Sequence, residues 1–278
     1  MTKKIVFLTG TRADFGKLSS LMDSVESDNT FECHIFVTGM HTLEKYGNTF
    51  DEIQKKGYKN ITVFHNQTDV NQQDLILART ITGFSEYVKR ISPDMIIVHG
   101  DRIEALAGAI VGSLNNILVS HIEGGEISGT VDELIRHAVS KLSHIHFTAN
   151  DEATDRLIQL GESKNSIFTI GSPDIHVMTN VELPTINEVL NHYEIPFKDF
   201  GVFIFHPVTT ELDALAEQIN EVVLSLIESD KNFVVIYPNN DNGTEIILEK
   251  IYELENNKKF MIFPSIRFLS FLTILKNA

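Results

Sequence analysis

Short apolar runs alternate with longer amphipathic segments over the first part of the chain. Runs short enough for buried strands occur at residues 5–8, 31–38, 61–64, 95–98, 117–119, 144–149 and 167–170. Between them, apolar residues recur at helical spacing, as at 72–90, 103–114, 131–142 and 152–160. Strands that alternate with helices predict a parallel sheet with helices on both of its faces.

A second α/β series follows a proline-containing stretch. Residues 171–198 include Pro173, Pro184 and Pro196, so we interpret them as an interdomain connection with short helices. Beyond them the pattern predicts strands at 202–205, 233–237 and 260–263, and helices at 211–229, 244–255 and 268–275. We therefore predict an α/β protein of two Rossmann-like domains, residues 1–172 and 173–278. These face each other across a cleft, as in enzymes of the GT-B type, and the second domain is incomplete.

The net charge of the chain and its cysteine content indicate which binding partners and which cellular compartment to expect. The chain has 278 residues, a formal net charge of −15 and a pI near 5.1. Such an acidic chain is not expected to bind nucleic acid or an anionic membrane. Its single cysteine, Cys33, cannot form an internal disulfide and fits a reducing compartment. The apolar run at residues 5–8 is too short for a signal peptide or a membrane helix, so we expect a cytoplasmic protein.

Charged side chains follow two strands of the first series. One group begins at His99, directly after its strand, and the other begins at His121. Ligands of open α/β sheets bind beyond the carboxyl ends of the strands. We therefore expect one crevice to contain the charged residues Asp101, Arg102, Glu123, Glu126 and Asp132. Crowded carboxylates can divide acid and base roles between them, but a solvated rim of charge is the alternative.

The second charged group runs into a helix. Thr130 to Glu133 matches a capping box, with Thr130 as N-cap. Asp132 and Arg136 are four residues apart, so we expect them to share the polar face, opposite the apolar residues Val131, Leu134, Ile135, Ala138, Val139 and Leu142. Asp132 then either belongs to the site or merely complements the helix dipole.

The turn after the first strand is a further candidate. Arg12 stands in a glycine-containing turn between strand and helix, where backbone N–H groups can hold an anion. A surface turn residue fits the same pattern. The turn matches neither the Walker loop nor the dinucleotide-binding fingerprint.

Eleven histidines raise the question of a metal site. His121 lies two residues before Glu123, as in zinc deaminases, but those enzymes need cysteines that this chain lacks. There is no His-Glu-x-x-His sequence and no Gly-x-Ser-x-Gly sequence. We therefore expect no metal and no nucleophilic serine, and we interpret His144 and His146 as structural.

Several ordered motifs carry a resemblance to a known family. They are His99-Gly100-Asp101-Arg102, the stretch His121 to Thr130, Ile135-Arg136-His137-Ala138, Arg12-Ala13-Asp14-Phe15, Tyr46-Gly47-Asn48-Thr49, His206-Pro207-Val208-Thr209-Thr210 and Pro238-Asn239. Together they closely resemble the hydrolysing UDP-N-acetylglucosamine 2-epimerases of sialic acid synthesis. The Ser-Gly-Thr sequence after Gly124-Gly125 resembles the hydrolysing branch.

This resemblance implies a reaction and a set of site residues. A base removes the C2 proton of the sugar while UDP leaves C1, and water then adds to the resulting 2-acetamidoglucal to give N-acetylmannosamine. The resemblance assigns catalysis to Asp101, Glu123 and Asp132, with Asp101 nearest the C2 chemistry. It assigns the diphosphate to Arg12, Arg102 and His206, and it places Asn239 in the nucleotide site. It implies no cofactor, and a homo-oligomer as the assembly.

Two other functions stay open at this point. The sibling epimerase that acts on UDP-2,4-diacetamido-2,4,6-trideoxyglucose shares these motifs, and a non-catalytic nucleotide-sugar-binding protein is a further alternative. Relatives continue beyond the equivalents of Leu275 to Ala278 with a strand and a Gly-Asn-Ser-Ser turn that holds the diphosphate. We therefore expect residues 1–278 alone to bind UDP weakly, to turn over poorly and to associate.

Overall fold

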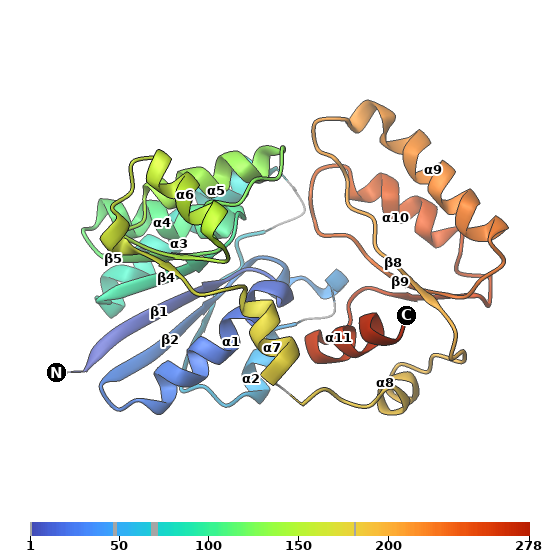
Figure 1. Ribbon diagram of the computed structural model, residues 1–278, viewed down its shortest axis with the longest axis horizontal. Helices are drawn as coiled ribbons and strands as arrows, with labels where there is room; N and C mark the ends of the chain where they lie inside the picture. The colour runs from blue at the N-terminus through green and yellow to red at the C-terminus, as the bar shows by residue number, and fades with distance from the viewer. Residues whose placement is uncertain (1, 47–48, 68–71, 181) are drawn as a thin grey trace. The chain divides into compact units, whose positions relative to one another are not determined.

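The computed structural model describes residues 2–46, 49–67, 72–180 and 182–278 (Figure 1). The chain divides into two compact units, Met1–Asn180 and Val181–Ala278. The helix α7 (Pro173–Asn180) belongs to the first unit, because it packs beside α1 (Arg12–Ser27) and buries Val177. The sequence placed this segment in the interdomain connection instead. Gly47 and Asn48, which belong to one of the family motifs, lie outside the described residues.

The first unit is built on one parallel sheet of seven strands in the order β3-β2-β1-β4-β5-β6-β7. These strands are β1 (Lys3–Thr9), β2 (Phe31–Val37), β3 (Asn60–Val63), β4 (Met95–His99), β5 (Leu118–Ile122), β6 (Ile145–Thr148) and β7 (Ile167–Thr169). The order of the strands reverses between β1 and β4. At such a switch point the connections leave the sheet in opposite directions, and the carboxyl ends of the two strands are open to a ligand.

Helices cover both faces of this sheet, as predicted (Figure 1). Besides α1 and α7 they are α2 (Phe50–Lys55), α3 (Gln73–Ile91), α4 (Ile103–Leu114), α5 (Val131–Lys141) and α6 (Asp151–Gln159). Successive residues of β1 point to opposite faces, so Val6 and Leu8 pack with α3 and α4 while Ile5 and Phe7 pack with α1.

The small residues of α4 let this helix lie close to the sheet. A Cβ at Gly108 would approach Val98 to 2.7 Å, and one at Gly112 would approach Val119 to 2.3 Å. The sequence-based interpretation of 103–114 as a core helix packed against the sheet is therefore confirmed.

The second unit contains a parallel three-stranded sheet in the order β10-β9-β8. Its strands are β8 (Gly201–Phe203), β9 (Phe233–Ile236) and β10 (Phe260–Phe263), and its helices are α8 (Ile186–His192), α9 (Leu212–Glu228), α10 (Thr244–Tyr252) and α11 (Phe268–Asn277). One apolar core lies under α9 and α10, and another joins α8 and α11 to the strands. Over the part of the chain that the structure describes, no helix combines the length and the apolar character needed to cross a membrane.

The start of α5 corrects two predictions. Thr130 does not cap the helix through its side chain; its hydroxyl donates to Asp132 instead, at 3.0 Å. Glu133 reaches past Thr130 to the backbone N–H groups of Ser128 and Gly129. The predicted apolar face is also wrong at its beginning, because Leu134 is 71% exposed, whereas Val139 is buried.

Candidate functional site

The loops after β1, β4 and β5 place three ionisable side chains together at the switch point of the sheet. Asp14 lies in the first turn of α1, His99 ends β4, and Glu123 follows β5. A capping box fixes the first of these positions. The hydroxyl of Thr11 accepts from the backbone N–H of Asp14, and Oδ2 of Asp14 accepts from the N–H groups of Gly10 and Thr11.

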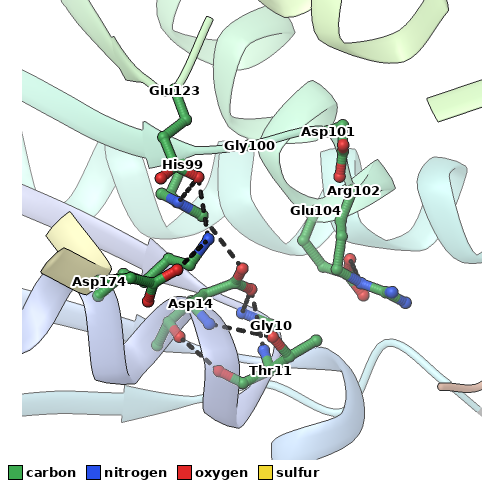
Figure 2. Close-up of polar contacts among 12 residues, drawn as sticks. Gly10, Thr11, Asp14, His99, Gly100, Asp101, Arg102, Glu104, Glu123 and Asp174 are labelled. Atoms are coloured by element: carbon green, nitrogen blue, oxygen red, sulfur yellow. Dashed lines mark hydrogen bonds and ion pairs between the residues drawn. The ribbon is translucent and has the colours of Figure 1, made fainter. Parts of the chain in front are cut away.

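His99 lies between the two carboxylates (Figure 2). Its Nδ1 is 3.3 Å from Oδ1 of Asp14, and its Nε2 is 2.9 Å from Oε2 of Glu123. The ring is 7% exposed. Because each side of the imidazole faces a carboxylate oxygen, the three groups form one chain of contacts from the start of α1, through the end of β4, to the residue that follows β5.

Two further side chains hold the carboxylate of Glu123. Lys17 Nζ donates to the same Oε2 at 2.9 Å, and Ser172 donates to Oε1 at 3.0 Å. Lys17 in turn lies 3.2 Å from Oδ2 of Asp174, at the start of α7. The backbone of Glu123 has φ +61°, a left-handed conformation that costs energy in a residue with a side chain. The surrounding contacts hold it there.

The charges of this cluster stabilise one another. Burial raises the pKa of Glu123, but the hydrogen bond and charge of His99, and then those of Lys17, outweigh it and hold that pKa well below its usual range. Burial likewise opposes ionisation of His99 and of Asp14. Their hydrogen bond and mutual attraction prevail, so that the pKa of His99 is raised and that of Asp14 is lowered.

The Asp101 turn is fixed by a second set of contacts. His121 Nε2 lies 2.8 Å from the carbonyl oxygen of Gly100, and its Nδ1 lies 3.0 Å from Oγ of Ser140. Burial lowers the pKa of His121 to about 3, so its ring is neutral at physiological pH. The neutral ring donates to the Gly100 carbonyl and thereby holds the peptide that precedes Asp101.

Asp101 itself is ion-paired with Arg136 of α5. Arg136 also donates to the carbonyl oxygen of Glu126 at 3.1 Å, and thus ties α5 to the loop after β5. The sequence placed Arg136 on the polar face of the helix with Asp132, but Arg136 is 9% exposed and its partner Asp101 comes from the turn after β4. A buried guanidinium needs a carboxylate within reach, and Asp101 supplies it.

Asp132 lies apart from these contacts. It is exposed in the first turn of α5, where it accepts a hydrogen bond from Thr130. Among the described residues, the structure brings Asp132 into contact with neither Asp101 nor Glu123. Asp101 and Glu123 follow the neighbouring strands β4 and β5. That one crevice contains all of these carboxylates stays a prediction.

The two candidate arginines of the first unit pair with different glutamates. Arg12 lies 2.7 Å from Oε1 of Glu52 in α2, and Nε of Arg102 lies 3.5 Å from Oε2 of Glu104 in α4. Glu104 is 1% exposed and fits against Gly10, where a Cβ would approach its carboxyl group to 3.0 Å. Both arginines thus stand at strand-to-helix turns that follow neighbouring strands, β1 and β4.

The second unit brings its two candidate residues together. His206 follows β8 and Asn239 follows β9, and these strands are neighbours. The backbone N–H of Asn239 donates to Nδ1 of His206 at 3.4 Å, and Thr244 donates to the Asn239 carbonyl oxygen at 2.5 Å. The side chain of His206 is exposed at the carboxyl edge of the sheet.

Sequence reasoning missed several members of the site. It gave no role to Asp14, Lys17, His99 or Asp174, and it misplaced Arg136. One local signal was available, because Thr11 and Asp14 have the spacing of a capping box. The other contacts join residues far apart in the chain, and no local pattern shows them. Within the described residues, no group of three or more His, Cys, Asp or Glu side chains is arranged to hold a metal ion.

Two glycines of the loop after β5 have left-handed backbone conformations, and only one of them also lacks room for a side chain. Gly125 has φ +82°, and a Cβ there would lie 2.3 Å from the carbonyl oxygen of Ala153. Gly129 has φ +70° but open space around it. We expect Gly129→Ala to cost about 1–2 kcal/mol for the left-handed backbone alone, and Gly125→Ala to cost distinctly more, as urea unfolding would show. Equal unfolding midpoints for the two variants would contradict this.

Comparisons with known proteins extend over nearly the entire chain. A family model described as UDP-N-acetylglucosamine 2-epimerase matches residues 23–278. The UDP-N-acetylglucosamine 2-epimerase of Neisseria meningitidis serogroup B is 48% identical over 276 residues, which cover 99% of this chain and 73% of that protein. A hydrolysing UDP-N,N'-diacetylbacillosamine 2-epimerase of Legionella pneumophila is 34% identical over 284 residues, which cover 100% of this chain and 75% of that protein.

A solved structure shows the same fold. The UDP-N-acetylglucosamine 2-epimerase of Methanocaldococcus jannaschii, in complex with UDP-N-acetylglucosamine and UDP, matches with a TM-score of 0.77 at 22% identity, over 99% of this chain and 77% of that chain. This likeness confirms the predicted GT-B-like α/β class. With the family match over residues 23–278 and the 48% identity to a curated relative, the chain belongs to the UDP-N-acetylglucosamine 2-epimerase family.

Proposed function

We propose that this protein is a hydrolysing 2-epimerase that converts UDP-N-acetylglucosamine into N-acetylmannosamine and UDP. The observation that carries the proposal is the 48% identity, over 99% of the chain, to a curated UDP-N-acetylglucosamine 2-epimerase. The ion-paired carboxylates Asp101 and Glu123, at the ends of neighbouring strands, support it. Proton transfer at carbon requires such positioned acid–base groups.

The reaction proceeds by elimination and hydration. A carboxylate takes the proton from C2 as the C1–O bond to UDP breaks, and the electron pair of the C2–H bond forms the double bond of 2-acetamidoglucal. Water then adds to C1, and C2 receives a proton from the opposite face. Both half-reactions move a proton at carbon, so more than one acid–base group is required.

We assign the groups as follows. Asp101 lies nearest the C2 chemistry, and Glu123 and Asp132 serve the hydration step. The diphosphate is neutralised by three cationic groups, Arg12, Arg102 and His206, through charge-assisted hydrogen bonds. Asn239 lines the nucleotide site, where its backbone contact with His206 fixes the turn. A cytoplasmic location and a homo-oligomeric state remain predictions from the sequence.

The test is incubation of the full-length protein, with any residues that follow Ala278 included, with UDP-N-acetylglucosamine in deuterium oxide. We expect equimolar UDP and N-acetylmannosamine, with deuterium at C2 because the abstracted proton exchanges with solvent before C2 is reprotonated. Nuclear magnetic resonance identifies the sugar and the label. N-acetylmannosamine that carries only protium at C2, even in a long incubation, would contradict the elimination route.

A second substrate is supported by one comparison. The Legionella pneumophila relative, 34% identical, is named a UDP-N,N'-diacetylbacillosamine 2-epimerase (hydrolyzing). The same assay with the diacetamido trideoxy sugar nucleotide, at equal concentration, ranks the two substrates by kcat/KM. We expect UDP-N-acetylglucosamine to be preferred, in line with the higher identity to the Neisseria meningitidis protein. A non-catalytic protein that only binds the sugar nucleotide would release UDP from neither.

A further inference from the structure

In the described cluster, His99 joins two carboxylates, one from the first turn of α1 and one from the residue that follows β5. It lies at the switch point of the sheet, with Asp14 on its Nδ1 side and Glu123 on its Nε2 side. Neither the sequence motifs nor the proposed reaction gives it a task. It is nevertheless the most buried ionisable group in direct contact with a proposed catalytic carboxylate, at 7% exposure.

We infer that His99 is a positioning residue: held as a cation between Asp14 and Glu123, it fixes Glu123, together with Lys17, as an oriented carboxylate that enters the reaction as a base. This inference rests on the proposed function of Glu123. What is new is that His99, with Lys17, keeps Glu123 ionised and fixes the orientation of its carboxylate.

The hydrogen-bonding capacity of imidazole supports the charged state. A neutral imidazole offers one N–H donor and one acceptor nitrogen, whereas imidazolium offers two donors. Both ring nitrogens of His99 face carboxylate oxygens, which accept only. A neutral ring would therefore set one nitrogen lone pair against a carboxylate in a buried place, at a considerable cost. The protonated ring satisfies both sides.

Asp14 is equipped to hold the far end of this chain. Its Oδ2 accepts from two backbone N–H groups, 3.3 Å away at Gly10 and 3.0 Å away at Thr11, and the nearby charge of Arg102 further favours its ionised form. A carboxylate with such donors stays ionised through the physiological range. Asp14 thus anchors the cation without taking its proton.

The groups around Glu123 act in the same direction. His99 and Lys17 both contact Oε2, so two cations face one oxygen, and Asp174 balances part of the charge of Lys17. The neighbouring ring of His121 is neutral and turned to Gly100. These contacts leave Glu123 ionised before substrate arrives. A group that begins as a carboxylate has to accept a proton before it can donate one, and its first act is therefore that of a base.

Fixed orientation follows from the number of contacts. Ser172 holds Oε1 while the two cations hold Oε2, so rotation of the carboxyl group would break three interactions. The side chain of Glu123 still keeps 17% of its surface exposed. Preorganised groups of this kind avoid the rearrangement that free side chains undergo during a reaction.

The experiment combines a direct observation with kinetics. Nitrogen-15 spectra of histidine-labelled protein, with His99→Gln to assign the signal, report how many protons the His99 ring carries. We expect both ring nitrogens to remain protonated at pH 7.5 in the substrate-free protein. In the kinetic arm, His99→Gln keeps a donor for Glu123 but removes the charge. We expect its kcat to fall about tenfold or more, with a smaller change in KM.

The pH profile separates positioning from a merely structural role. Loss of the His99 cation raises the pKa of Glu123, so the acidic limb of kcat/KM should move up by about one pH unit or more in His99→Gln. Lys17→Met removes the second cation beside Glu123 and should also move the acidic limb of kcat/KM to higher pH. Asp14→Asn lowers the pKa of His99, and its loss of activity should therefore increase as the pH rises.

His34→Gln is the matched control. His34 is also buried beside a carboxylate, with Nε2 2.9 Å from Oε1 of Glu32, but it lies within β2. This variant should keep the wild-type profile. A neutral His99 ring at pH 7.5, or unshifted acidic limbs in His99→Gln and Lys17→Met, would overturn the inference. Should UDP-N-acetylglucosamine not be turned over, the proposed function fails, and the ring-nitrogen measurement still decides the charge of His99.

Discussion

Replacement of Asp101 by Asn is expected to lower the turnover of UDP-N-acetylglucosamine at least about a hundredfold, the scale on which general acid–base groups contribute. The amide keeps the size of the side chain but cannot accept a proton. Asp101 ends the turn that His121 holds through Gly100, and Arg136 orients its carboxylate from α5. Asp101→Asn removes the charge of the ion pair, but the contact between His121 and Gly100 persists and the amide oxygen can still accept from Arg136. We therefore expect KM to change much less than kcat.

The measurement is UDP release in a coupled assay, with far-ultraviolet circular dichroism to confirm the fold. Asp155→Asn on α6 is the matched control, since Asp155 is an exposed aspartate of the same unit. It should keep wild-type turnover. If Asp101→Asn also kept wild-type turnover, Asp101 would have no part in the reaction, and its carboxylate would serve only to neutralise Arg136.

The strands and helices were predictable because each is set by local sequence. The apolar runs of β1 and β4 are flanked by turn residues, and the helix predicted at 103–114 has the bounds of α4 (Ile103–Leu114). Burial on both faces of a parallel sheet makes its strands continuous apolar runs, which are easily seen. The carboxyl ends of those strands could therefore be named in advance as the place of the site.

The contacts within the site were not predictable, because they depend on distance in space. Lys17 and Glu123 are 106 residues apart, and Arg136 and Asp101 are 35 apart. The error at Arg136 came from a local rule, in which a residue four positions away offers a partner. The half-buried carboxylate of Asp101, which follows β4, was a stronger partner for Arg136 than the exposed carboxylate of Asp132 on the same helix. Local rules fail where tertiary contacts compete with them.

The capping box at Thr130 failed for a related reason. The motif offers Glu133 the N–H of the N-cap residue, but the preceding loop turns so that Ser128 and Gly129 both present their N–H groups to it. Gly129, with φ +70°, makes that turn possible. The similar pattern at Thr11 and Asp14 does form a capping box, and there it serves the site.

Replacement of Glu123 by Gln is expected to lower the formation of N-acetylmannosamine at least about a hundredfold and to release 2-acetamidoglucal. If Glu123 serves hydration, the elimination step survives its loss while the addition of water does not. The amide cannot accept a proton, and it sets an NH2 group near two cations, His99 and Lys17. Nuclear magnetic resonance of the products detects the vinylic proton of the glucal directly.

Glu152→Gln provides the control, because Glu152 is exposed on α6 and pairs there with Arg156. It should form N-acetylmannosamine at the wild-type rate with no free glucal. The comparison of Glu123→Gln with His99→Gln then separates the group that reacts from the group that positions it. A positioning residue retains the wild-type product at a lower rate and with a displaced pH profile, whereas loss of the base changes the product. Wild-type rates in Glu123→Gln would remove Glu123 from the chemistry and leave its ion pairs as stabilising contacts between β4, β5 and α1.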